Sequence, residues 1–125
     1  MTQTVGIIGA GQMGNGIAHV FSLAGFKVLL NDISLERVDA GLATINGNLS
    51  RQAASQRITE DDRSKALARI HAAPDLFTLA EADLVIEAAT ENESLKGDIL
   101  REVSAILPPE TIIASNTSSI SITRL

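Results

Sequence analysis

Three glycines near the start of the chain have the spacing that brings backbone amides against a phosphate group. The segment that they define consists of Gly9, Ala10, Gly11, Gln12, Met13 and Gly14. In the pattern G-x-G-x-x-G the first glycine permits a tight turn, the second lets a ligand approach the backbone, and the third lets a helix pack closely on a strand. A helix that begins here directs free N–H groups and a partial positive charge at an anion. The same glycines could also form an ordinary strand-to-helix turn, so the context of the segment matters.

The context is an acidic residue at the distance that is typical of a dinucleotide site. The glycines follow an apolar run at residues 4–8, and Asp32 closes the next apolar run. A carboxylate about 20 residues after the glycines accepts hydrogen bonds from ribose hydroxyls, and its charge repels the extra phosphate of NADP. The nearest arginine, Arg37, lies inside the next predicted helix. We therefore predict that residues 9–14 and Asp32 bind NAD, the alternative for Asp32 being a cap of the helix after it.

Two later loops carry polar groups where ligands of open parallel sheets bind, at the carboxyl ends of strands. Glu91 follows one predicted strand and could contact a ribose or an amide, or could support the next helix N-terminus. Residues 115–119 (SNTSS) follow another strand. Their hydroxyl and amide groups could position a substrate oxygen or could bond the backbone of a turn. The pattern leaves Glu91 open and favours the turn for residues 115–119.

The two histidines are predicted to be structural or solvated. His19 lies within the first predicted helix, and His71 at the far end of another. Neither has a carboxylate partner at the spacing of a catalytic triad, and the sequence shows no cluster of metal ligands, so no metal is expected. A reaction that transfers a hydride needs a proton acceptor, which we expect outside the 125 residues.

Strands and helices are predicted to alternate along the chain. The predicted strands are residues 4–8, 27–31, 69–73, 83–87 and 111–114. The predicted helices run from Gln12 to Gly25, from Ser34 into the low fifties, from Thr59 to near His71, and from Thr90 to Pro108. This alternation predicts a doubly wound parallel α/β sheet of the Rossmann type with a helical hairpin insertion. Because that fold has about six strands, we expect residues 1–125 to be one incomplete NAD-binding domain, truncated before the last strand or strands.

The composition limits the class of protein. The chain has 125 residues, 45% hydrophobic residues and a net charge of −5, which fits one globular domain and argues against binding to nucleic acid. Its apolar runs are too short to span a membrane, and its N-terminus lacks the features of a signal peptide. Together with the absence of cysteine, these features predict a cytoplasmic protein without membrane contact.

Three segments resemble the 3-hydroxyacyl-CoA dehydrogenase family, and its short bacterial 3-hydroxybutyryl-CoA dehydrogenases most closely. They are VGIIGAGQMGNGIA at residues 5–18, LVIEAA at residues 84–89 and ASNTSS at residues 114–119. The resemblance extends over essentially the whole chain, and the last segment is more specific to the family than the first. It implies reversible hydride transfer between C3 of a 3-hydroxyacyl-CoA and NAD, which gives the 3-ketoacyl-CoA.

The resemblance also assigns roles to single residues. Glu91 and Lys96 match positions that contact the cofactor, and Ser118 matches the serine that hydrogen-bonds the reacting 3-oxygen near the nicotinamide. The general base of the family is a histidine in a Gly-x-His-Phe-Phe-Asn-Pro segment, oriented by a later glutamate, and this chain contains neither. The family's helical C-terminal domain, which completes the substrate cleft and forms the homodimer, is likewise absent.

The predicted helical hairpin corresponds to the part of the family that holds acyl-CoA. Asn48 aligns with a polar residue that contacts CoA. Where relatives carry lysines for the CoA phosphates, this chain has Ala54 and Ser55, which leaves Arg51 and Arg57 as the nearby cations. The family pattern therefore predicts the class of chemistry of this chain, but not its affinity for CoA or its preferred acyl chain.

Two alternatives to this function stay open. A β-hydroxyacid dehydrogenase also has a G-x-G-x-M-G segment, but it usually favours NADP through a cationic residue near position 33, where this chain has Ile33. The second alternative is a non-catalytic NAD-sensing module that kept the fold without the chemistry.

Overall fold

The computed structural model describes residues 3–88, 93–115 and 121–123. Its strands are β1 (Thr4–Ile8), β2 (Lys27–Asn31), β3 (Ile70–Ala72), β4 (Leu84–Glu87), β5 (Ile112–Ser115) and β6 (Ser121–Thr123). Its helices are α1 (Gln12–Leu23), α2 (Leu35–Ala54), α3 (Glu60–Ala68), the 3₁₀ helix η1 (Leu76–Glu81) and α4 (Glu93–Ile106). No helix in the described ranges has the length and apolar character that crossing a membrane requires.

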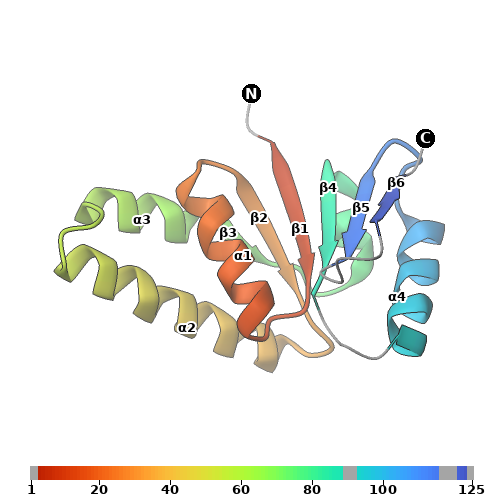
Figure 1. Ribbon diagram of the computed structural model, residues 1–125, viewed down its shortest axis with the longest axis horizontal. Helices are drawn as coiled ribbons and strands as arrows, with labels where there is room; N and C mark the ends of the chain where they lie inside the picture. Colours follow the sequence, from red (N-terminus) through yellow and green to blue (C-terminus); the bar gives the residue numbers. More distant parts are fainter. Residues whose placement is uncertain (1–2, 89–92, 116–120, 124–125) are drawn as a thin grey trace.

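The strands form one six-stranded sheet in the order β3-β2-β1-β4-β5-β6 (Figure 1). The strands from β1 to β5 run parallel, and β6 pairs antiparallel with β5. The order of the strands changes direction at β1. Strands β2 and β3 lie on one side of it, and β4 and β5 lie on the other. Such a reversal leaves a crevice at the carboxyl ends of the central strands, where ligands of this fold bind.

Helices cover the sheet from both sides, as parallel sheets require. Helices α1, α2 and α3 gather beside β1, β2 and β3, whereas α4 lies near β5 (Figure 1). The two faces of β1 show the division, because Val5 and Ile7 join the cluster with α1 and α2 while Ile8 joins the cluster with η1 and α4. Strand β2 divides in the same way, with Leu30 on the first face and Leu29 on the second.

The structure confirms the predicted α/β class and the helical hairpin, and it adds two elements. Neither η1 nor β6 was predicted. Helix η1 lies between β3 and β4, where no element was predicted. It buries Leu79 and exposes Phe77, so its apolar residues do not follow a helical period. The prediction that a helix extends to near His71 is wrong. Helix α3 ends at Ala68, and His71 lies exposed in β3, where the strand pairs with β2.

The buried face of helix α1 agrees only in part with the apolar spacing of its sequence. The spacing of Ile17, Val20 and Phe21 predicts that they share a buried helix face. Ile17 and Phe21 are partly buried against the core, whereas Val20 is 65% exposed. The buried residues of α1 are instead small or polar, namely Gly14, Asn15, Ala18 and Ser22. Small side chains let the helix axis approach the sheet, and the partly buried Ile17 and Phe21 pack against the same core from beside them.

The hairpin helices α2 and α3 begin at the predicted caps. The side chain of Ser34 accepts a hydrogen bond from the Arg37 N–H, 3.3 Å away. The side chain of Thr59 accepts from the Asp62 N–H, and the Asp62 carboxylate accepts from the Thr59 N–H, which completes a capping box. These bonds satisfy amides that a helix start otherwise leaves unpaired.

Candidate functional site

The glycine segment forms a tight turn between β1 and α1. Gly9 adopts a φ of 113°, a conformation that favours glycine, and its N–H donates to the Asn31 carbonyl of β2 at 2.7 Å. A Cβ atom on Gly14 would lie 1.8 Å from the Gly9 carbonyl oxygen. The turn therefore closes only because position 14 has no side chain, which is the packing role predicted for the third glycine.

The N-terminus of α1 opens beside Gly11. This residue has extended backbone, and no side chain caps the helix or places an acid in its first turn. A Cβ atom on Gly11 would meet nothing within 4 Å among the described residues. The first helical hydrogen bond runs from the Asn15 N–H to the Gly11 carbonyl, 2.9 Å away, so the amides of residues 12–14 have no partner within the helix. An anion could approach these amides, which fits the predicted phosphate site.

Asp32 lies directly against this turn. One carboxylate oxygen, Oδ2, accepts from the Ala10 N–H at 2.7 Å, and the other, Oδ1, accepts from the Ile33 N–H at 2.6 Å. Since Ser34 caps α2, the alternative role of Asp32 as that cap is not observed. An ionised carboxylate accepts about four hydrogen bonds, so each oxygen retains capacity for a hydroxyl group.

A hollow of about 330 Å³ extends from Asp32 across the carboxyl ends of β1, β2 and β3. Its walls are Ile8, Gly9, Asn31, Asp32, Ile33, Pro74, Asp75, Leu76, Ile99 and Glu102. The mix of an acidic edge and apolar walls suits a nucleoside, with the sugar at Asp32 and the base against the apolar side chains. The walls from residues 74–76 and from α4 were not predicted from the sequence. The position of residues 74–76 just after β3 was the available signal.

The loops that carry the other predicted cofactor and substrate residues start at the same edge. Ile8 pairs with Glu87, and Glu87 pairs with Ser115, so β1, β4 and β5 end side by side. Glu91 and Ser118 themselves lie outside the described residues. Lys96 belongs to α4, where the structure describes its backbone position alone. The ends of β4 and β5 thus lie at the same edge of the sheet as the glycine turn, and the roles of these three residues stay predictions.

A second hollow, of about 520 Å³, lies between α1 and the end of α2. Its walls are His19, Asn48, Arg51, Gln52, Ser55 and Arg57. His19 was predicted to be structural, and its Nε2 does bond Gln52 Oε1 across the two helices at 2.7 Å. It nevertheless borders the same hollow as Asn48, which is hydrogen-bonded to Arg51. The walls contain two arginines and no acidic residue, so the hollow suits an anionic group.

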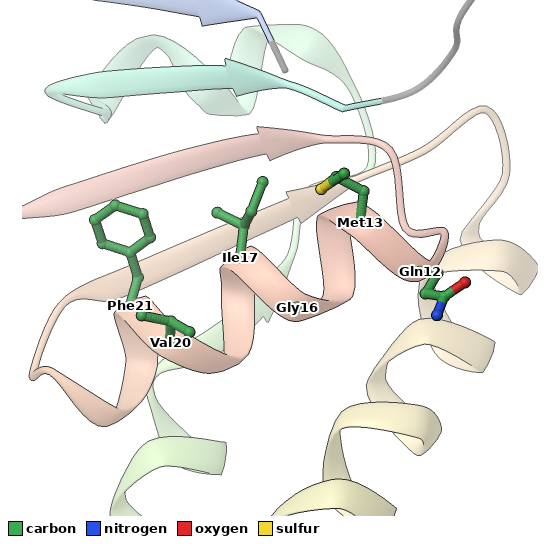
Figure 2. Close-up of a pocket in the computed structure, with 6 residues that line it drawn as sticks. All are labelled: Gln12, Met13, Gly16, Ile17, Val20 and Phe21. Atoms are coloured by element: carbon green, nitrogen blue, oxygen red, sulfur yellow. The ribbon is translucent and has the colours of Figure 1, made fainter. Parts of the chain in front are cut away.

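The outer flank of α1 carries a third, apolar hollow. Figure 2 shows Met13, Ile17 and Phe21 projecting from one side of the helix, with Val20 beside them. Met13 is 54% exposed. Within the described ranges, no three His, Asp or Glu side chains lie close enough together to hold a metal ion.

Comparisons with known proteins agree with this geometry. The family model for the NAD binding domain of 3-hydroxyacyl-CoA dehydrogenase matches residues 4–125. A 3-hydroxybutyryl-CoA dehydrogenase of Bradyrhizobium diazoefficiens is 61% identical over 121 residues, which are 97% of this chain and 41% of that protein. A 3-hydroxyadipyl-CoA dehydrogenase of Escherichia coli is 40% identical over 98% of this chain and 26% of its own length.

A solved structure supports the same relationship. The crystal structure of (S)-3-hydroxybutyryl-CoA dehydrogenase from Ralstonia eutropha superposes with a TM-score of 0.91 at 48% sequence identity, over 98% of this chain and 43% of the other. The chain therefore spans about two fifths of the length of the two 3-hydroxybutyryl-CoA dehydrogenases and about a quarter of the 3-hydroxyadipyl-CoA dehydrogenase. Its glycine turn, its Asp32 and its sheet all lie within the region that the family model matches. On these grounds the chain belongs to the family of NAD-binding domains of 3-hydroxyacyl-CoA dehydrogenases.

Proposed function

We propose that this chain is the NAD-binding part of an enzyme that interconverts a 3-hydroxyacyl-CoA and a 3-ketoacyl-CoA, as its relatives named 3-hydroxybutyryl-CoA dehydrogenase do. The observation that carries the proposal is the pairing of two features. The uncapped amides of α1 lie beside the open position at Gly11, and the Asp32 carboxylate is bonded to the same turn through the Ala10 N–H. Together they offer donors for a pyrophosphate and acceptors for a ribose.

Different residues in and beside the turn bind different parts of the dinucleotide. Gly11 leaves room for the pyrophosphate, and the amides of residues 12–14 donate to its oxygens. Asp32 accepts from the ribose hydroxyls, and the hollow bounded by Ile33 and Leu76 holds the base. NAD, when bound, supplies the acceptor or donor of the hydride. The chain's own contribution here is to fix where the dinucleotide lies.

The residues beyond β4 and β5 are proposed to act at the reacting end. We assign Glu91 and Lys96 to cofactor contacts and Ser118 to a hydrogen bond with the 3-oxygen of the substrate, on the strength of the family resemblance. The parallel pairing of β1 with β4 and of β4 with β5 supports this, because both strands end at the edge of the sheet where the glycine turn lies. Neither histidine suits the general base: His19 bonds Gln52, and His71 lies exposed in β3.

The hollow at the end of α2 is proposed to receive the CoA part of the substrate. Asn48 borders it together with Arg51 and Arg57, and the arginines supply positive charge for phosphate groups. We place the general base and the dimer contacts in the polypeptide that the relatives have beyond the matched region, and the parent protein in the cytoplasm. On this assignment, residues 1–125 belong to the NAD-binding domain of the parent, and the helical domain of the family is a separate, C-terminal unit.

The first test compares two dinucleotides. Titration of the chain with NADH and NADPH, followed by nicotinamide fluorescence, is expected to show at least about tenfold tighter binding of NADH, because Asp32 repels the 2′-phosphate. The substitution Asp32→Ala is expected to reduce the difference between the affinities for NADH and NADPH. That substitution also removes the bond to Ala10, so NADH itself should bind less well. Equal binding of both dinucleotides by the unaltered chain would contradict the role of Asp32.

The second test separates an enzyme from an NAD-sensing module. Reduction of acetoacetyl-CoA by NADH is expected from a protein that joins this chain to the remaining three fifths of a relative, and no turnover from the chain alone. Turnover by the chain alone would contradict the assignment of the base. A β-hydroxyacid dehydrogenase is disfavoured, because position 33 carries an apolar side chain that is 86% exposed.

A further inference from the structure

We propose that Gly41 on α2 is a positioning residue for the NAD site. It lies 27 to 32 residues away from the glycine turn in sequence, yet α2 contacts the turn at this position. The absence of a side chain lets α2 press directly on Ala10 and Asn15 and hold the turn in the geometry that binds phosphate. The inference rests on the proposed function, since it concerns the same dinucleotide site.

The contacts of Gly41 are close on every side that a side chain would occupy. The residue is buried. A Cβ atom there would lie 2.6 Å from Asn15 Oδ1, 3.1 Å from Ala10 Cβ and 3.1 Å from the Ala10 carbonyl oxygen. A methyl group at position 41 would therefore displace at least one of the two partners.

Asn15 has little room to move away. It is 6% exposed, and its Oδ1 is buried without a hydrogen-bond partner in the part of the chain that the structure describes. Its backbone N–H is the donor of the first hydrogen bond of α1, to Gly11. A displacement of Asn15 would therefore also displace the first turn of α1, whose free amides are proposed to bind the phosphate.

Ala10 is held from its other side. Its N–H donates to Asp32 Oδ2 at 2.7 Å, and the preceding Gly9 N–H donates to the Asn31 carbonyl at 2.7 Å. A methyl group at position 41 would push Ala10 while these two bonds anchor it. The displacement would consequently affect both the phosphate-binding amides and the carboxylate that accepts from the ribose.

The same helix offers a matched control. A Cβ atom on Gly47 would first meet Arg51 Nη1 at 3.7 Å, an ordinary contact. Alanine is a better helix former than glycine at both positions. A general effect on α2 would therefore appear equally in Gly41→Ala and Gly47→Ala, whereas the proposed contact affects Gly41→Ala alone.

The experiment measures NADH and NADPH binding to the 125-residue chain and to its Gly41→Ala and Gly47→Ala variants, with circular dichroism as a check of folding. Gly47→Ala is expected to keep the NADH Kd within about twofold of the parent, and Gly41→Ala to raise it by about tenfold or more. We also expect Gly41→Ala to reduce the preference for NADH over NADPH, because Asp32 shifts with Ala10. A purely structural role of Gly41 would leave that preference unchanged.

A double variant keeps the test decisive if Gly41→Ala does not fold. Asn15→Ala removes the atom of the closest contact, and Gly41→Ala in that background retains the two contacts with Ala10. The double variant is expected to fold and to bind NADH at least about threefold less tightly than Asn15→Ala alone. Equal affinities in either comparison would overturn the proposal. If the unaltered chain bound no NADH, the proposed function itself would have failed.

Discussion

The N-termini of α1 and α3 show two opposite ways to start a helix. Helix α3 satisfies its own amides, with Thr59 and Asp62 bonded reciprocally and two further acids in the first turn. Helix α1 begins after Gly11 with no capping side chain and no acid in its first turn. The partial positive charge of the helix N-terminus is thus neutralised within α3 itself, whereas in α1 it is available to a ligand. The comparison teaches that the missing cap leaves the N-terminus of α1 able to bind an anion, as the proposed phosphate site requires.

The two helix starts also differ in where their negative charge originates. In α3 the acids are part of the helix, and Arg63 pairs with Glu60 on its surface. At α1 the carboxylate comes from outside the helix, because Asp32, the residue after β2, accepts from the Ala10 N–H just before the helix. Asp32 therefore borders the open amides without covering them, which leaves both the donors and the acceptor accessible to one dinucleotide.

The largest effect is expected from closing the turn that precedes α1. Gly14→Ala would place a methyl group 1.8 Å from the Gly9 carbonyl oxygen. Overpacking of this kind should lower the free energy of unfolding by about 3 kcal/mol and abolish NADH binding. Urea unfolding and fluorescence titration measure the two effects. Gly16→Ala is the control, because its Cβ would meet nothing within 4 Å; an unfolding midpoint for Gly14→Ala equal to that of the control would refute the packing role.

Converting the start of α1 into the type seen in α3 should remove binding without loss of stability. Gly11→Asp places a capping carboxylate in a backbone conformation that is already extended, with open space for its Cβ. Aspartate in place of a glycine N-cap stabilises a helix by only a few tenths of a kcal/mol, while its charge competes with the pyrophosphate for the same amides. We expect the NADH Kd to rise by about a hundredfold. Isothermal titration calorimetry provides the measurement, and unchanged affinity would show that the phosphate binds elsewhere.

The reverse change removes the cap from α3. Thr59→Ala deletes the acceptor for the Asp62 N–H, and the expected loss in unfolding free energy is about 1 kcal/mol. NADH affinity should not change, because α3 contributes no wall to the hollow at Asp32. Thermal unfolding with and without NADH separates stability from binding. A weaker NADH affinity in this variant would show that the two helix starts are not independent.

The smallest effect concerns pH. The Thr59 N–H and hydroxyl bond the Asp62 carboxylate, and these bonds lower its pKa from the ordinary value. A lowered pKa in the folded state means that the stabilisation is complete above the pKa of the unfolded chain, about 3.9, and is lost as the pH falls through the folded value. Asp62→Asn should make the free energy of unfolding less dependent on pH below about pH 4. Asp61→Asn serves as control, because that carboxylate pairs with Lys65 instead, and it should retain the slope.

The sequence predicted those features that depend on local pattern. The glycine spacing, the caps at Ser34 and Thr59 and the strand that ends before Asp32 are encoded within a few residues of each other, and the structure has the turn, the caps and the strand in these places. Strand β3 was also predicted, at residues 69–73, although the overlapping helix prediction at His71 was wrong because β2 pairs with that segment.

Features that depend on contacts between distant segments could not be predicted in this way. The exposed position of Val20 follows from the small residues that bring α1 close to the sheet. Gly41 contacts the glycine turn from another helix, and a glycine within a helical pattern gives no sign of its neighbours. The walls of the hollow at Asp32 come from β1, β2, the segment after β3 and α4, which only the sheet order brings together.

The contrast between Gly11 and Gly14 has a consequence for how this domain changes over evolutionary time. Position 14 is constrained by the fold itself, whereas no described residue limits the size of residue 11, where the pyrophosphate is proposed to bind. A descendant that no longer bound a dinucleotide would keep the glycine at position 14 and accumulate other residues at position 11. The identity of that single residue therefore distinguishes copies under selection for cofactor use from copies under selection for folding alone.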